Sequence, residues 1–196
     1  MKRLPRLAIL AVTALVFPAL AQAHPGHEGH ELTWDFSAGF AHPVSGLDHL
    51  LAMLAVGLWA AQLGARARWL VPAAFVGVMA LGGALGGAGV TMPGLEQGIA
   101  ASVLVIGLII AASVRLPIVA GMALVGGFAV FHGVAHGAEM PAAADGLGYG
   151  AGFVAATALL HAAGVGLGLL TGKVSACVPR LAGWGIAAAG VGMLAS

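Results

Sequence analysis

Long apolar segments separated by short polar connections constrain this chain more than any other feature. Each segment is long enough, at a rise of about 1.5 Å per residue, to cross the roughly 30 Å hydrocarbon core of a bilayer as an α-helix. Only 8% of the residues are charged, whereas soluble domains contain about 25%. The sequence therefore predicts an all-α polytopic protein in the lipid bilayer, with six transmembrane helices at residues 38–63, 69–90, 97–114, 117–136, 147–171 and 178–195.

The N-terminus has the three parts of a secretory signal peptide: a basic start, an apolar core over 7–20 and an A-x-A cleavage site at 21–23. An uncleaved first helix is the alternative, but an apolar core of about fourteen residues is short for a transmembrane span. We therefore expect a signal peptide over 1–23, a periplasmic tail over 24–36 and a transmembrane domain over 37–196.

The predicted mature tail is rich in histidine. His24, His27 and His30 alternate with Glu28 and Glu31, and a free α-amine would add one more ligand. Short His-rich tracts are typical of metal binding, but a polar terminus without a specific role also fits this composition. Both interpretations stay open, so these histidines are the weaker metal-binding candidates.

The charges in the connections predict how the chain is oriented. After the signal peptide, every Lys and Arg follows the first, third or fifth span, whereas the other connections carry only acidic charges. Cytoplasmic loops are the ones enriched in Lys and Arg. We therefore expect a multi-pass protein of the bacterial inner membrane with both mature termini in the periplasm. The inner charges are Arg66, Arg68, Arg115, Lys173 and Arg180, and the outer ones are Glu96, Glu139 and Asp145.

A polar constellation opens the first apolar segment, where His42 and His49 flank Asp48. An ionised Asp at the centre of a membrane helix costs about 2.5–3.5 kcal/mol on insertion scales, so such a group is expected to face a cavity or to bind something. On one continuous helix the two histidines, seven residues apart, share a face. Ser45 and Met53 fall on the same stripe, which makes Met53 a weaker candidate ligand.

A second constellation closes the fourth apolar segment. His132, His136 and Glu139 have i, i+4, i+7 spacing and therefore line one face of a helix. His161 lies in the middle of the fifth segment. We predict one shared site for a divalent metal. Its innermost ligands are Asp48, His49, His132 and His136, with His42 and Glu139 nearer the entrance and His161 deeper along the path.

The donor set excludes several classes of site. Imidazole and carboxylate suit nickel, cobalt, zinc or copper(II). The single Cys177 excludes an intramolecular disulfide and a thiolate-rich metal site. The sequence has no basic patch with interleaved aromatic residues, so binding to nucleic acid has no support. It also has no intact phosphate loop, because Val174 stands where the Ser or Thr after Gly172-Lys173 would be required. The sequence predicts no bound cofactor and no ATP coupling within this chain.

Two motifs carry a resemblance to a known family. H-P-x-x-G-x-D-H-x-x-x-M over residues 42–53 and F-H-G-x-A-H-G-x-E over residues 131–139 resemble the first-helix and fourth-helix signatures of the HupE/UreJ proteins. The resemblance implies uptake of nickel, sometimes cobalt, that supplies hydrogenase or urease maturation. It also implies metal-handling roles for His42, Asp48, His49, His132, His136 and Glu139. The choice of nickel rests on the family alone.

The preferred function is a secondary, non-enzymatic transporter of a divalent metal ion. An inside-negative membrane potential or coupling to protons could each drive it. The rival hypothesis is an intramembrane zinc-dependent hydrolase, in which Ser45, Asp48, His132 and His136 would supply a positioning hydroxyl and three ligands. A membrane-anchored metal sensor is a third hypothesis, but the sequence has no soluble signalling domain.

Overall fold

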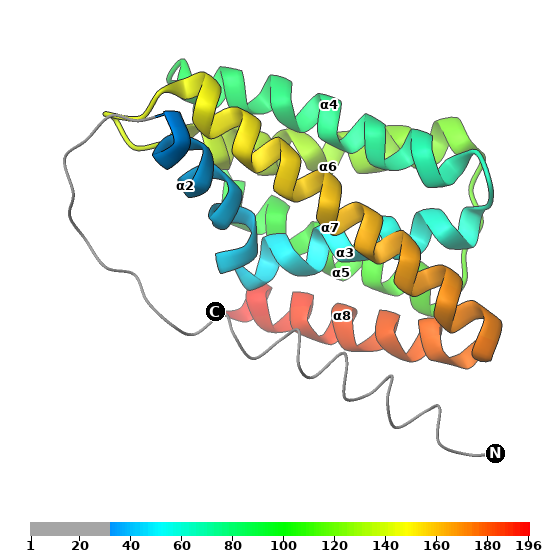
Figure 1. The fold of residues 1–196 in the computed structure, drawn as a ribbon. Helices are drawn as coiled ribbons and strands as arrows, with labels where there is room; N and C mark the ends of the chain where they lie inside the picture. Colours follow the sequence, from blue (N-terminus) through cyan, green and yellow to red (C-terminus); the bar gives the residue numbers. More distant parts are fainter. Residues whose placement is uncertain (1–31) are drawn as a thin grey trace.

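The structure is a computed structural model that describes residues 32–196, so the predicted signal peptide and His24, His27 and His30 lie outside the described residues. The regular structure of the described part is all helical, which confirms the predicted all-α class (Figure 1). Its helices are α2 (Leu32–Ser45), α3 (Leu47–Leu63), α4 (Ala67–Gly87), α5 (Leu95–Ala111), α6 (Ile118–Ala138), α7 (Gly146–Val174) and α8 (Cys177–Ala195).

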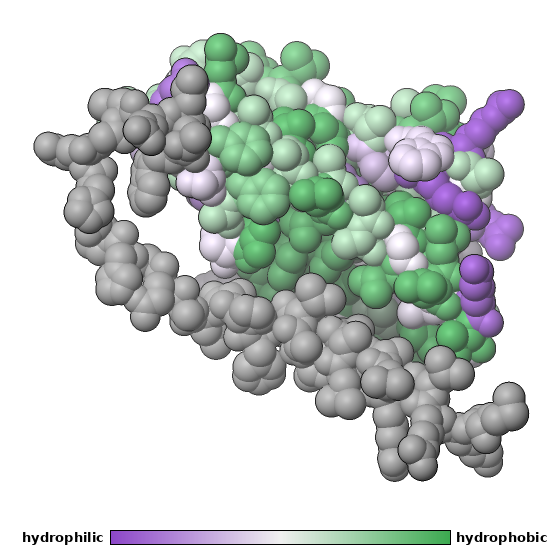
Figure 2. All heavy atoms as spheres, viewed as in Figure 1, coloured by the Kyte–Doolittle hydropathy of each residue, from purple (hydrophilic) through white to green (hydrophobic). Residues whose placement is uncertain are grey.

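The lengths and surfaces of these helices indicate a membrane protein. Helices α4, α6, α7 and α8 are each long and apolar enough to cross a membrane, and the bent pair α2–α3 makes a fifth crossing if it is counted as one. Large apolar side chains face outward, among them Trp69, Val119 and Leu147, which are 79%, 77% and 85% exposed. Apolar side chains also cover much of the face drawn in Figure 2. An apolar surface of this extent marks contact with lipid, and the protein is a multi-pass membrane protein.

The two ends of the bundle differ in charge. At one end, α3, α5 and α7 stop and α4, α6 and α8 start, and the Nε of Arg180 donates to the hydroxyl of Ser113 across 2.9 Å. We call this the basic end; its cationic residues are Arg66, Arg68, Arg115, Lys173 and Arg180. Hydrophilic side chains gather on the right of Figure 2, at this end. The opposite, acidic end carries Asp35, Glu96, Glu139 and Asp145.

The first apolar segment is not one continuous helix. Helices α2 and α3 meet at an angle of 81°, and Gly46 between them has an extended backbone, with φ −92° and ψ 124°. An extended residue interrupts the i→i−4 hydrogen-bond ladder, and Pro43 in the last turn of α2 has no N–H to contribute to it. The break therefore turns the chain between the two helices, so that α3 starts in a new direction with an exposed Leu47 and a buried His49.

Small residues let α6 approach α4 at backbone contact distance. A Cβ on Gly133 would overlap the carbonyl oxygen of Met79, and one on Gly137 would overlap that of Gly83. Glycine at such positions is how membrane helices bring their backbones together. Because both glycines belong to the turns that carry His132 and His136, the close packing fixes the depth and direction of these histidines.

Candidate metal centre

The break between α2 and α3 places the first constellation against the last turns of α6. His42 lies on α2, Asp48 and His49 lie in the first turn of α3, and His132 and His136 come from α6. The expectation that His42 and His49 share one face of a continuous helix is wrong, because Gly46 interrupts that helix. The two imidazoles still lie close together, with ring centroids 6.3 Å apart.

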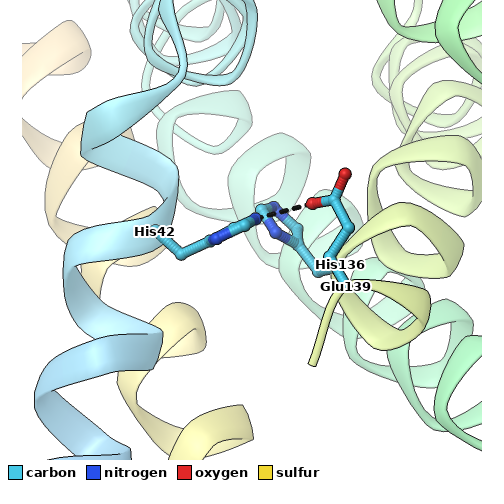
Figure 3. A group of neighbouring side chains, drawn as sticks. All are labelled: His42, His136 and Glu139. Atoms are coloured by element: carbon cyan, nitrogen blue, oxygen red, sulfur yellow. Dashed lines mark hydrogen bonds and ion pairs between the residues drawn. The ribbon is translucent and has the colours of Figure 1, made fainter. Parts of the chain in front are cut away.

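The most exposed part of the site contains three possible ligands, His42, His136 and Glu139, which we call the outer trio. One nitrogen or oxygen atom from each lies within 4.8 Å of the others (Figure 3). The Nε2 of His42 and the Oε2 of Glu139 are 2.8 Å apart, and these side chains are 29% and 49% exposed. A cation arriving from solvent can therefore reach the Glu139 carboxylate and the His42 imidazole first, and the buried His136 lies directly behind them.

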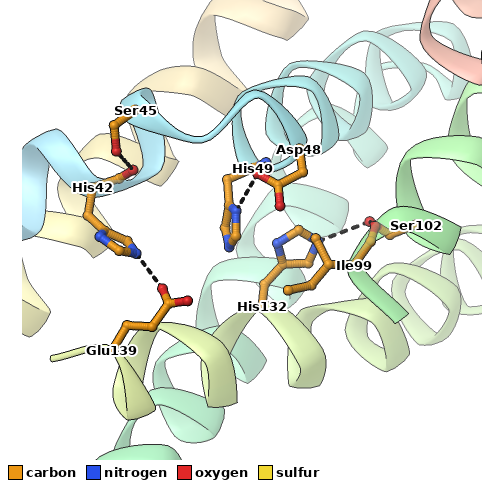
Figure 4. Close-up of polar contacts among 8 residues, drawn as sticks. All are labelled: His42, Ser45, Asp48, His49, Ile99, Ser102, His132 and Glu139. Atoms are coloured by element: carbon orange, nitrogen blue, oxygen red, sulfur yellow. Dashed lines mark hydrogen bonds and ion pairs between the residues drawn. The ribbon is translucent and has the colours of Figure 1, made fainter. Parts of the chain in front are cut away.

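Behind the outer trio lie His49 and His132, which we call the inner pair. The ring centroid of His49 is 4.5 Å from that of His136 and 4.9 Å from that of His132. The centroids of His42 and His136 are 4.9 Å apart. His136 and His132 are fully buried, so the four imidazoles form a continuous row from the partly exposed His42 into the interior. Figure 3 shows His136 beside His42, and Figure 4 shows His49 and His132.

Asp48 is directed at His49. Its Oδ1 accepts hydrogen bonds from the backbone N–H of His49, at 2.7 Å, and from the ring Nδ1, at 2.8 Å. An ionised carboxylate can only accept, so the Nδ1 of His49 carries the proton and the Nε2 presents a lone pair. In metal sites, ligating histidines commonly donate their second N–H to a carboxylate in this way. The carboxylate of Asp48 also lines a cavity of about 540 Å³ at the acidic end of the bundle.

Several buried ring nitrogens have no hydrogen-bond partner within residues 32–196. Three of the residues concerned lie in the row, with the Nε2 of His49, the Nδ1 of His132 and both nitrogens of His136, and outside the row both nitrogens of His161 are also unpaired. Leaving a buried polar atom unpaired costs about 1–3 kcal/mol, and the three residues belong to one continuous row. A row of inward-facing lone pairs is suited to a cation.

His161 and Met53 stand apart from the row. His161 is buried on α7, and its ring packs edge-on against Phe75, with centroids 5.0 Å apart. Phe75 also lies 5.4 Å from the ring of His132, so it contacts both imidazoles. Met53 is fully buried in the apolar core. The structure therefore brings neither His161 nor Met53 into the outer trio or the inner pair.

The rival hydrolase hypothesis gains no support from the geometry of its hydroxyl. The Oγ of Ser45 donates to the backbone oxygen of His42, in its own helix, at 2.8 Å. In Figure 4 Ser45 lies apart from Asp48 and His132, and its hydroxyl points at the backbone of His42. The hydroxyl is thus committed to α2 and does not join His132 and His136.

Two side chains at the site are not part of either sequence motif. Phe75 on α4 packs on His132 and His161, and Ser102 on α5 lies with its Oγ 3.0 Å from the Nε2 of His132. Ser102 is the only hydroxyl residue in 97–111, and this isolated polar group was the one signal in the sequence. No spacing rule connects it to His132, because the contact joins two different helices.

Comparison with known proteins agrees with the two motifs. The family described as HupE / UreJ protein matches residues 11–193. Protein HupE from Rhizobium leguminosarum bv. viciae is 47% identical over 185 residues, which cover 93% of this chain and 94% of that relative. No solved structure matches the chain. The match extends over both motifs and all described helices, and the chain therefore belongs to the HupE/UreJ family.

Proposed function

We propose that this protein imports a divalent transition metal ion, nickel or cobalt, across the bacterial inner membrane. The imported ion serves the maturation of hydrogenase or urease, a role suggested by membership of the HupE/UreJ family. The metal is the transported substrate and no cofactor takes part. The chain acts as a secondary transporter and not as an enzyme.

The observation that supports transport best is the graded exposure of the imidazole row. His42 and Glu139 are partly exposed at 29% and 49%, whereas His132 and His136 are 0% exposed. A site with a purely structural metal would be closed on all sides. A row that begins in solvent and continues into the interior offers successive positions along a path.

The chemistry of each position supports a stepwise passage. Glu139 and His42 attract the hydrated ion and replace part of its water. His136 belongs to the outer trio and also contacts the ring of His49, so it hands the ion to the inner pair. Neutral imidazoles bind nickel or cobalt without closing a rigid cage, and a transported ion needs such a site because it must also leave. The ion then passes inward towards Phe75 and His161.

An inside-negative membrane potential is sufficient to drive this movement. One charge crossing 100 mV gains about 2.3 kcal/mol, so a divalent ion gains about 4.6 kcal/mol. At about 1.4 kcal/mol per tenfold change, this supports an accumulation of roughly a thousandfold. Metal uptake by proteoliposomes with an imposed potential, with and without a pH gradient, separates this mechanism from coupling to protons.

We propose six crossings, with the mature N-terminus and the C-terminus in the periplasm and the basic end in the cytoplasm. The bent pair α2–α3 supplies the first crossing and α5, with 17 residues, the third. The positive charges at the basic end support this orientation. Cys177 is the chain's single cysteine and is exposed near that end. A membrane-impermeant maleimide should therefore label it in inside-out vesicles and not in intact cells.

The direct test is uptake of radioactive nickel by cells that produce His136→Ala. This histidine connects the outer trio to the inner pair, so its loss should abolish uptake. Thr171→Ala is the control, because the Thr171 hydroxyl bonds only within α7, near the basic end. Uptake that survives His136→Ala at an unchanged protein level would exclude the imidazole row as the path. Competition by cobalt and zinc in the same cells tests which metal is preferred.

A further inference from the structure

A buried serine outside both motifs contacts one histidine of the inner pair. Ser102 is 0% exposed on α5, and its Oγ has two polar neighbours. It lies 2.6 Å from the backbone oxygen of Ile99 and 3.0 Å from the Nε2 of His132 (Figure 4). The hydroxyl therefore links the backbone of α5 to an imidazole of α6.

The single proton of the hydroxyl determines the direction of both hydrogen bonds. The carbonyl oxygen of Ile99 can only accept, so Ser102 must donate its proton to that oxygen. The contact with His132 is then one in which Ser102 accepts and the imidazole donates. The Nε2 of His132 thus carries a proton, which leaves the Nδ1 of the neutral ring with a lone pair.

The unprotonated nitrogen of His132 lies on the side of its ring that faces His49. Figure 4 shows the second ring nitrogen of His132 on the edge that faces His49. The two rings are perpendicular, with an interplanar angle of 89° and a centroid separation of 4.9 Å. This Nδ1 is buried and has no partner within residues 32–196. The Nε2 of His49 is in the same situation, because Asp48 holds its Nδ1 proton.

We propose that Ser102 is a positioning residue that sets the tautomer of His132, so that the Nδ1 of His132 and the Nε2 of His49 face the same ion. Two side chains outside the row hold the two rings by hydrogen bonds: Asp48 holds His49, and Ser102 holds His132. Partners of this kind typically change metal affinity by about 10–100-fold when they are removed. The proposal rests on the proposed function for its metal and on the hydrogen bonds of Ser102 for its tautomer.

The tautomer is tested without metal. Solid-state NMR of the full chain in lipid, labelled with ¹⁵N in its histidine rings, distinguishes protonated from unprotonated nitrogens, and His132→Gln identifies the His132 signals. We expect His132 to be protonated at Nε2 in the unchanged protein and to show both tautomers in Ser102→Ala. Ser102→Thr, which keeps the hydroxyl, should restore one tautomer. Protonation of His132 at Nδ1 in the unchanged protein would overturn the proposal.

The consequence for metal binding is tested by calorimetric titration of the purified protein with nickel. Ser102→Ala should weaken binding by about tenfold or more, and Ser102→Thr should recover most of that loss. Thr157→Val is the matched control, because Thr157 is an equally buried hydroxyl that bonds to the sulfur of Met79 and to no imidazole. Equal affinities of Ser102→Ala and the unchanged protein would overturn the proposal. No nickel binding by the unchanged protein would refute the proposed function instead, while the NMR result still decides the tautomer.

Discussion

The outer trio and the inner pair contain similar ligands that are held in different ways. In the outer trio, His42 and Glu139 bond to each other across 2.8 Å, so an arriving ion must replace a contact that the ligands already make. In the inner pair, Asp48 bonds to the Nδ1 of His49 and Ser102 bonds to the Nε2 of His132. The other nitrogen of each ring is left to bind the ion. The outer ligands are therefore exchangeable, and the inner ligands are fixed before the metal arrives.

This difference assigns two tasks to one row of imidazoles. Ligands that pair with one another and touch solvent exchange their partners at low cost, which favours capture and release. Rings whose second nitrogen is held by a buried partner need little reorganisation when the ion binds, which favours selection. The comparison leads to four predictions, which are given in order of decreasing expected effect.

The largest of these four effects is expected at the inner pair itself. His49→Ala or His132→Ala removes a ligand whose free nitrogen is buried, and nickel uptake should fall by more than the roughly 10–100-fold that follows the loss of a supporting partner. Initial uptake rates in cells, corrected for the amount of protein in the membrane, measure the effect. If either variant transports nickel like the unchanged protein, the inner pair is not on the path.

Removing the charge that holds His49 should have the next largest effect. Asp48→Asn keeps an oxygen acceptor but loses the carboxylate, so we expect the KM for nickel to rise by about 10–100-fold. Asp145→Asn is the matched control, because Asp145 caps α7 through the N–H of Gly148 and contacts no imidazole. An equal response of the two variants would show that Asp48 acts only through the general negative charge of the acidic end.

A smaller effect is expected at the exposed carboxylate of the outer trio. Glu139→Gln removes an exposed charge, whose attraction for a nearby cation is worth about 1 kcal/mol in a water-like environment, or about fivefold in KM. Because exposed charges are screened by salt, the difference from the unchanged protein should shrink as ionic strength rises. A loss as severe as that of Asp48→Asn and independent of salt would remove the distinction between the outer trio and the inner pair.

The smallest effect is expected at the break in the first segment. A Cβ on Gly46 would lie 2.7 Å from the Oδ1 of Asp48, so Gly46→Ala should displace the carboxylate that holds His49. The backbone angles of Gly46 are open to alanine, which leaves the added methyl group as the cause. We expect the rate of nickel uptake to fall by about threefold, which corresponds to the free-energy cost of one strained side-chain rotamer. Gly192→Ala, where a Cβ meets open space, is the control.

The sequence was sufficient to predict the parts of the site that depend on regular helix geometry. His132, His136 and Glu139 were expected on one face from their i, i+4, i+7 spacing, and the structure brings His136 and Glu139 into the outer trio and His132 into the inner pair. The same spacing rule failed for His42 and His49, because Gly46 stops α2. Pro43 and Gly46 stand in the sequence at the break, but a continuous apolar segment does not indicate where a helix changes direction.

Contacts between helices could not be predicted from one sequence. The hydrogen bond from His132 to Ser102 and the packing of Phe75 between His132 and His161 depend on how α4, α5 and α6 are placed around each other. Hydrophobic periodicity gives the inward face of each helix but not its depth relative to its neighbours. In this protein, that depth is set where Gly133 and Gly137 touch the backbone of α4.

The bend of 81° between α2 and α3 has a mechanical consequence. His42 belongs to one rigid rod and His49 to another, and a single glycine joins the two rods. Helix α2 packs so closely on α7 that a Cβ on Gly39 would overlap the carbonyl oxygen of Tyr149, and α7 therefore holds the rod that carries His42. The distance an ion must travel between capture and selection is thus set by the helices that hold the two rods on either side of Gly46.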